Sequence, residues 1–399
     1  MQLRLITNEE LHGGHYAPRR VAPGATISRD RRTYVWDLGV RAFHWSLVAS
    51  VTGALATGFL APRWWLDIHV VLGSIVAALI GLRIVWGGLG TTYARFGSFL
   101  VSPLTAARYA FALVRGGAPH FTGHNPVGTL MIVALIMTAF ILIGTGVVAL
   151  GGIVKQGPMA SIATYAAGVT GKNLHEAAAW LLLMLIAGHV SGVVIESIRT
   201  RENLVASMLS GYKRIRSAAV TSPPSRARPW QAAAVAVALA VVIVPPIVAT
   251  SAITPASVPS EPIDAVYLKE CSACHSAHHP SLAPAATWTR IIDNLDDHFG
   301  DNAGLDQILA ERLRLYLTAN SAEVWDTEAA NLMRVTASGG ALRITETVGW
   351  KNAHRDVDPA AFKTKAVGGK LNCAACHADA NAGRFAPRAI ELPKERTTP

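Results

Sequence analysis

Residues 174–198 read LHEAAAWLLLMLIAGHVSGVVIESI, an apolar run with His175 near its start and His189 well inside it. As an α-helix, this run is long enough to cross a bilayer, for which about 20 residues suffice. The two histidines are fourteen positions apart, which places both imidazoles on one face, about 21 Å apart along the helix axis. A histidine inside a membrane span is costly unless it faces the bundle interior with a partner. The pattern predicts two partnered sites on one stripe. The alternative is two unrelated histidines, one interfacial and one bonded to a neighbouring helix.

The composition of the 399-residue chain indicates a membrane protein. Hydrophobic residues make up 51% of it and the mean hydropathy is +0.32, which is more apolar than an ordinary soluble domain. The formal charge of +10 is uneven, because residues 1–260 carry +13 and residues 261–399 carry −3. The basic charge belongs to the loops of a membrane part. No regular basic patch with interleaved aromatic residues points to nucleic acid, so the expected partner is a lipid bilayer.

Five apolar segments are long enough to span the membrane, which predicts a mainly α-helical fold. The fifth is an Ala/Val run that ends at Pro245 and Pro246, and residues 103–116 read as an interfacial helix. The expected spans are residues 38–61, 66–87, 126–150, 174–198 and 230–249.

Composition also divides the chain into four parts. Residues 1–33 are polar and contain nothing that resembles a cleavable signal peptide, so we expect a flexible cytoplasmic tail. Residues 34–215 hold the first four spans as a four-helix membrane bundle. Residues 216–265 form a linker that contains the fifth span, and residues 266–399 form a polar domain.

The placement of lysine and arginine predicts the orientation. With the N-terminus inside, the inside segments hold 17 basic residues and the short outside loops hold three. Because basic residues favour the cytoplasmic side of short loops, this orientation is strongly preferred. Five spans then place the C-terminal domain outside, where conditions are oxidising.

The orientation predicts partners for the two histidines of the opening stretch. His44 in the first span lies toward the inner face, and His69 in the second lies toward the outer face. His175 is outer and His189 is deeper, toward the inside. The four sort into two depths, His69 with His175 and His44 with His189. Two bis-histidine b-type haems, one near each face, would use all four.

Other polar residues near the inner face have less defined roles. Asp37, Arg41 and Arg83 could serve the protonation of a quinone, or could equally be ordinary interface anchors. His120 and His124 lie on an inner loop, and no histidine matches them as a partner.

Two Cys-x-x-Cys-His motifs are the strongest chemical signal. Residues 271–275 read CSACH and residues 373–377 read CAACH. In this motif the cysteine sulfurs bond covalently to a haem and the histidine ligates its iron, which predicts two c-type haems in the exported domain. A zinc ribbon would use four cysteines too, but with pairs much closer in sequence. The predicted attachment residues are Cys271, Cys274, Cys373 and Cys376, with His275 and His377 as proximal iron ligands.

The sixth iron ligands are predicted from the remaining histidines of this domain. His298 lies in a helix-like segment after the first motif, and His354 precedes the second motif. We assign His298 to the first haem and His354 to the second. His278 and His279 are too close to His275 to reach the distal face of the same haem, although either could ligate the other one. Met333 is more typical of a core residue.

The membrane part resembles the bacterial cytochrome b561/nickel-hydrogenase cytochrome b family over residues 34–215. The resemblance rests on WDLGVRAFHW, DIHVVLGSI, the GHNPVG entry to the third span and the two histidines of the fourth. It implies that the bundle holds two b haems, exchanges electrons with membrane quinone and lies in a bacterial inner membrane. The ligand positions that it implies are His44, His69, His175 and His189.

The polar domain is similar to the dihaem cytochrome c (DHC) family over residues 267–393. The matching segments are ECSACH, LDDHFGDNAGLD, RITET and NCAACH, and the resemblance supports His298 and His354 as candidate ligands. The fused c-type domain departs from a simple cytochrome b561 protein. A function defined by a separate catalytic partner, such as a hydrogenase, is therefore in doubt.

Together these patterns predict a membrane electron-transfer protein of the respiratory chain. Electrons would pass between the quinone pool and a soluble periplasmic electron-transfer protein, through two b haems and two c haems. One alternative is a haem oxidoreductase that acts directly on a small oxidant such as superoxide. Another is a passive membrane anchor for the c-type domain.

Overall fold

The chain forms two compact units. The computed structural model describes residues 31–215, 222, 224–336 and 341–393. The first unit comprises Met1–Phe59, His69–Gly144 and His175–Val244, and the second comprises Leu60–Ile68, Thr145–Leu174 and Pro245–Pro399. Most of the expected cytoplasmic tail, residues 1–30, lies outside the described residues.

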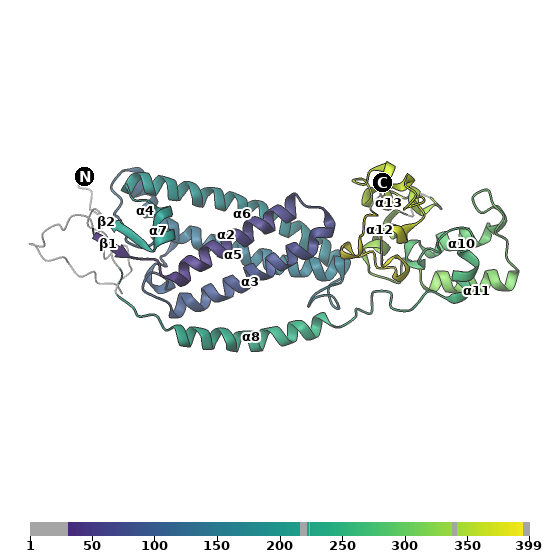
Figure 1. Cartoon of the computed structure of the whole chain (residues 1–399), viewed down its shortest axis with the longest axis horizontal. Coiled ribbons are helices and arrows are strands. Elements are labelled where there is room, and N and C mark those ends of the chain that lie inside the picture. Colours follow the sequence, from purple (N-terminus) through teal and green to yellow (C-terminus); the bar gives the residue numbers. More distant parts are fainter. Residues whose placement is uncertain (1–30, 216–221, 223, 337–340, 394–399) are drawn as a thin grey trace, which may run out of the picture. The chain divides into compact units, whose positions relative to one another are not determined.

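Four long helices of the first unit pack side by side (Figure 1). They are α2 (Leu38–Phe59), α3 (Leu66–Leu89), α5 (Pro126–Ala149) and α6 (Tyr165–Thr200). Their shared apolar core joins Val76 and Ile80 of α3 with Ala139 of α5, and Phe43 and Leu47 of α2 pack against it. The predicted four-helix bundle is thus confirmed.

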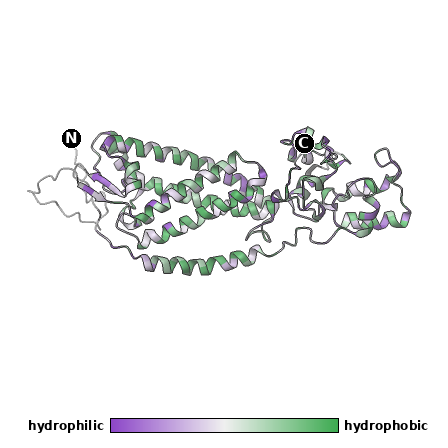
Figure 2. Cartoon of the chain, viewed as in Figure 1, coloured by the Kyte–Doolittle hydropathy of each residue, from purple (hydrophilic) through white to green (hydrophobic). Residues whose placement is uncertain are grey.

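Four helical segments of the described chain are long and apolar enough to cross a membrane. They are Arg63–Leu89, Pro126–Val154, Tyr165–Thr200 and Pro229–Ser251, and Figure 2 displays their apolar character. α2 has 22 residues but is not among the four, because residues such as Arg41 and His44 lower its mean hydropathy. The expected total of five spans is therefore not confirmed.

α6 begins at Tyr165, nine residues before the predicted start of its span. Its first turns, AAGVTGKN, are small and polar, so hydropathy does not reveal them as part of a spanning helix. Here the helix lies against the π-helical turn Leu150–Val154 that ends α5. A Cβ on Gly152 would lie 2.5 Å from the Cα of Gly168, so this close backbone approach requires glycine.

α8 (Pro229–Ser251) is the apolar helix that precedes the linker. The expected span, 230–249, lies within this helix, which continues through Pro245 and Pro246 to Ser251. Proline lacks the N–H that would bond to the preceding turn, so the helix gives up two backbone hydrogen bonds there. Ala232 is the single buried residue of α8, which leaves its apolar surface exposed.

Short elements form the end of the first unit near the start of α2. They are β1 (Arg31–Tyr34), α4 (Pro103–Val114), α7 (Leu204–Ser210) and β2 (Tyr212–Ile215). β1 pairs antiparallel with β2, with Tyr34 opposite Tyr212, so residues 31–33 of the expected tail belong to a strand. α4 confirms the helix predicted over residues 103–116, and its location at the membrane interface stays a prediction. Ser102 and Asn203 cap α4 and α7 with side-chain oxygens that accept backbone N–H groups.

The C-terminal part of the second unit contains short helices around two small apolar cores. The helices are α9 (Ala265–Cys271), α10 (Ala285–Asp293), α11 (Gln307–Ala319), α12 (Glu328–Thr336) and α13 (Val348–Ala353). One core contains Trp288 and Leu313, and Cys271 packs against it. The other contains Met333 and Trp350, and Phe385 packs against that one. Each core thus lies near one of the two Cys-x-x-Cys-His motifs.

The first core should depend strongly on α11. Leu313 is fully buried there, whereas Leu315 on the same helix is 62% exposed. We expect Leu313→Ala to lower the free energy of unfolding by about 2–5 kcal/mol, because it removes apolar contacts and leaves a cavity. The matched control Leu315→Ala should stay within about 0.5 kcal/mol of the parent. Denaturant unfolding of the full chain measures both, and equal effects of the two variants would contradict this core.

Candidate haem-binding sites

The two histidines of α6 differ in what the structure places beside them. The imidazole of His175 lies beside that of His69, with ring centroids 6.0 Å apart and planes at 72°. His189 lies within electrostatic range of His44 on α2. The contact of His69 with His175 agrees with the predicted depths. The pairing of His44 with His189 stays a prediction, since His189 is within electrostatic range of His124 as well.

Backbone carbonyls orient the first of these pairs. The Nδ1 of His69 lies 3.0 Å from Ala54 O, and the Nδ1 of His175 lies 3.0 Å from Leu142 O. Because a carbonyl oxygen can only accept, each Nδ1 must carry the proton, which leaves Nε2 as the unprotonated nitrogen. Such outer hydrogen bonds are typical of metal-ligating histidine. At the other pair, His44 Nδ1 is buried and has no hydrogen-bond partner among the described residues.

The second unit contains two further histidine pairs with nearly the same separation. The ring centroids of His275 and His298 are 6.2 Å apart, with planes at 16°. Those of His354 and His377 are 6.1 Å apart, with planes at 83°. Each pair joins the histidine of one Cys-x-x-Cys-His motif to the sixth ligand predicted for that motif.

These separations fit one metal ion between two imidazoles. Two imidazole–metal bonds of about 2 Å each, with about 1 Å from each bonded nitrogen to its ring centre, together span about 6 Å. Three of the four predicted pairs have centroid separations of 6.0–6.2 Å. Bis-histidine ligation of haem iron is therefore compatible with the residues present in both units.

The histidines of the second unit are suited to act as neutral ligands. His354 Nδ1 donates to Trp350 O at 2.9 Å, and His275 Nδ1 donates to Ser276 O at 2.9 Å. Burial lowers the pKa of His354 below its ordinary value. Burial, aided by the nearby His275, also lowers the pKa of His298. Both shifts favour the neutral imidazole, which keeps the lone pair that iron would bind.

The four cysteines lie in two separate pairs and form no disulfide. Cys271 is the last residue of α9, and burial raises the pKa of its thiol to about 11. Cys373 begins a short 3-10 turn that leads to Cys376. Among the described residues, no three or more His, Cys, Asp or Glu side chains converge as a metal-ion site. The zinc-ribbon alternative therefore finds no support in this part of the chain.

The other candidate ligands of this domain have structural contacts. His279 is buried, and its Nδ1 accepts from Ser281 N at 3.2 Å, so it caps the turn that follows. Met333 is buried in a core, where its sulfur accepts from Thr347 Oγ1 at 3.5 Å. His278 stacks on His275 with centroids 5.3 Å apart and lines a small cavity with residues of the second motif.

The inner-face polar residues also have structural roles. Asp37 accepts hydrogen bonds from Val40 N, Trp86 Nε1 and Thr91 Oγ1, which caps α2 and ties it to α3. These contacts account for Asp37 without a quinone. Arg83 and Arg41 are likewise engaged. Arg83 donates to Ala94 O and stacks on Phe96, and Arg41 donates to Leu209 O.

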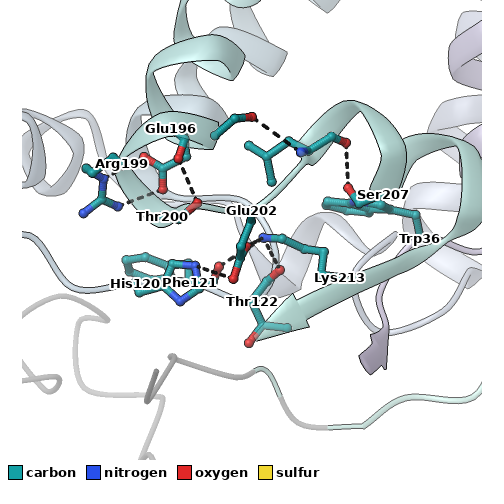
Figure 3. Close-up of polar contacts among 12 residues, drawn as sticks. Trp36, His120, Phe121, Thr122, Glu196, Arg199, Thr200, Glu202, Ser207 and Lys213 are labelled. Atoms are coloured by element: carbon teal, nitrogen blue, oxygen red, sulfur yellow. Dashed lines mark hydrogen bonds and ion pairs between the residues drawn. The ribbon is translucent and has the colours of Figure 1, made fainter. Parts of the chain in front are cut away.

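The sequence did not reveal a buried charged cluster beside β2 (Figure 3). Glu202, just after α6, lies 3.5 Å from both His120 Nε2 and Lys213 Nζ. Burial alone would raise the pKa of Glu202, but His120 and Lys213 outweigh it and lower that pKa. Nearby, burial and the positive charge of Arg83 lower the pKa of His124 to about 3. The partners come from distant segments, so spacing along the chain carries no signal of the cluster.

Comparison with protein families identifies both parts of the chain. Residues 35–211 match the model of the prokaryotic cytochrome b561 family, and residues 267–385 match that of dihaem cytochrome c. The chain joins a cytochrome b561 domain to a dihaem cytochrome c domain. Both kinds of domain carry haem, and the resemblance read from the sequence is confirmed.

Individual relatives of the cytochrome b561 domain are hydrogenase subunits by name. Probable Ni/Fe-hydrogenase B-type cytochrome subunits of Rhizobium leguminosarum bv. viciae and Cupriavidus necator are each 25% identical to it. Each alignment spans 48% of this chain, with 93% of the first subunit and 90% of the second.

Solved structures resemble the dihaem cytochrome c domain. The diheme cytochrome c of Rhodobacter sphaeroides is 38% identical over 30% of this chain and 95% of its own, with a TM-score of 0.27. The diheme cytochrome c of Shewanella baltica OS155 is 30% identical over 33% of this chain and 95% of its own, with a TM-score of 0.27.

Removing one histidine of α6 should remove one b-type haem and leave the other. We expect His175→Ala and His189→Ala each to lose half of the b-type haem, since each histidine has its own partner. Pyridine haemochrome spectra of the purified variants measure this, with His120→Ala as a control that keeps full content. Loss of all b-type haem in one single variant, with the protein still folded, would contradict separate sites.

Replacing a predicted sixth ligand should change one redox potential. We expect His354→Met to raise the potential of one c-type haem by a fraction of the about 0.8 V range that axial ligands span, because methionine favours the reduced iron. Asn352→Met, an exposed neighbour on α13, is the matched control. Spectroelectrochemical titration reports all potentials. An unchanged titration in His354→Met would exclude His354 as a ligand.

Proposed function

We propose that this chain is a membrane electron carrier that links the quinone pool to a soluble periplasmic acceptor through two b-type and two c-type haems. The observation that carries the proposal is the presence of three facing histidine pairs in one chain, one in the membrane bundle and two in the c-type domain. His44 and His189 are the proposed fourth pair. When bound, each haem accepts and releases one electron at a time.

The protein residues would set where the haems bind and how tightly they are held. α6 supplies one imidazole to each b-type site, so its rigid backbone fixes the spacing between the two sites. The carbonyls of Ala54 and Leu142 orient His69 and His175. In the c-type domain, covalent attachment at the cysteines would hold each haem against its own apolar core.

A periplasmic location of the c-type domain is supported by contacts within the second unit. Arg63 and Lys155 belong to the two loops predicted to lie outside the membrane. They form ion pairs with Glu328 and Asp326 of the c-type domain. Loops and domain would therefore share one side of the membrane, as the distribution of basic residues also favours.

The proposal predicts that b-type ligation is needed for reduction of the c-type haems by quinol. We expect His189→Ala to slow this reduction at least about ten-fold, corresponding to about 1.4 kcal/mol or more in barrier height. Stopped-flow spectroscopy of the full chain in lipid vesicles measures it, with His120→Ala as the matched control.

Undiminished reduction in His189→Ala would make the membrane domain a passive anchor.

Titration of the reduced protein with carbon monoxide provides a second check. We expect every haem to be six-coordinate, so carbon monoxide should leave the spectra unchanged. Tight binding of carbon monoxide by the native protein would instead favour direct chemistry on a small oxidant.

A further inference from the structure

The second unit holds two membrane loops and the c-type domain together. Leu60–Ile68 connects α2 with α3, and Thr145–Leu174 connects α5 with the main part of α6. From the contacts within this unit we infer that Lys155–Asp326, supported by Arg63–Glu328, is a latch that fixes the c-type domain on these loops. The latch sets the position from which the domain exchanges electrons. This inference rests on the proposed function.

Lys155 is held in an unusual and buried position. It follows the π-helical turn Leu150–Val154 with φ at +56°, in the left-handed region that lysine rarely adopts. Its side chain is 5% exposed, and its Nζ donates to Asp326 at 2.6 Å and to Ala163 O at 2.9 Å. A buried ammonium group is costly unless it is paired and hydrogen-bonded. The backbone turn therefore directs this charge toward the c-type domain.

Asp326 joins three segments through one carboxylate. Its Oδ2 accepts from Lys155 Nζ and, at 2.8 Å, from the backbone N–H of Tyr165, the first residue of α6. Its Oδ1 accepts from Asn331 at 3.1 Å, and its own N–H donates to Ser257 O. The start of a 36-residue helix also favours a negative charge. Asp326 thus links both halves of the long loop to the c-type domain.

The Asp326 carboxyl is ionised in this setting. Burial alone would raise its pKa, but the hydrogen bonds from Lys155, Tyr165 N and Asn331 outweigh burial and lower that pKa. The charge that meets Lys155 is therefore present at neutral pH. Replacing Asp326 with asparagine keeps the shape of the side chain and removes this charge.

A second pair supports the same placement from the other loop. The Nη2 of Arg63 lies 2.9 and 2.7 Å from the two carboxylate oxygens of Glu328, the first residue of α12. Arg63 is 57% exposed, so this pair contributes less than the buried one. The two loops hold three basic residues in all, and two of them bind acidic residues that flank Thr327. The complementary charges thus converge on one short segment of the c-type domain.

A fixed domain differs from a tethered one in the rate of electron exchange. A domain held only by the linker must search for a productive orientation before each transfer, whereas a latched domain keeps the orientation continuously. Lys155 and Asp326 are positioning residues in this sense, because neither lies in a haem site described above.

Asp326→Asn in the full chain tests the latch. We expect quinol-driven reduction of the c-type haems to slow at least about ten-fold, while reduction of the b-type haems stays at the parent rate. Hydrogen exchange, read by mass spectrometry, should rise in residues 150–165 of the same variant. Asp293→Asn is the matched control, since Asp293 forms a 2.6 Å ion pair with Arg314 inside the c-type domain. It should change neither measurement.

If Asp326→Asn folds poorly, charge reversal of the exposed pair Arg63–Glu328 provides a second test. Arg63→Glu alone should slow c-type reduction and raise exchange in residues 60–68, and adding Glu328→Arg should restore both. A parent-like rate in Asp326→Asn, or no rescue in the double variant, would overturn the latch. Failure of quinol to reduce the c-type haems in the parent protein would instead refute the proposed function. The exchange measurements would still report on the latch in that case.

Discussion

A histidine inside an apolar helix needs a partner, and the structure of the bundle depends on this constraint. α6 carries two such residues, His175 and His189, fourteen positions apart on one stripe. The 3.6-residue period aims both toward the interior, so α2 and α3 must each present an imidazole at a matching depth. Packing among Val76, Ile80 and Ala139 holds these helices together. On this account, the histidine pairs select which faces of the helices meet.

The c-type domain reaches the same pair geometry with a different backbone. Its histidines come from short helices and turns, and two small cores replace the long helical interface. Centroid separations of 6.0–6.2 Å nevertheless recur in both units, although the ring planes meet at angles from 16° to 83°. The distance between the ring centroids is the feature that the pairs share. This is expected if one metal ion lies between the two imidazoles of each pair. Carbonyls at Ala54, Leu142 and Trp350 orient rings in both domains.

Helical periodicity and local motifs predicted much of this architecture. The depths of His44, His69, His175 and His189 follow from span order alone, and each Cys-x-x-Cys-His motif is local. The early start of α6 at Tyr165 was missed because its first turns are not apolar. Contacts between distant segments were also missed. The cluster around Glu202 and the pair Lys155–Asp326 join residues whose charges look like ordinary loop charges in the sequence.

The haem content of the purified full chain tests the central claim most directly. Pyridine haemochrome spectra, normalised to protein by amino-acid analysis, give the number of b-type and c-type haems per chain. The four histidine pairs of the proposal, three of them in contact, predict two of each. A single b-type haem per chain would contradict the role of α6 as the shared support of two sites, and fewer than two c-type haems would contradict the assignment of both motifs.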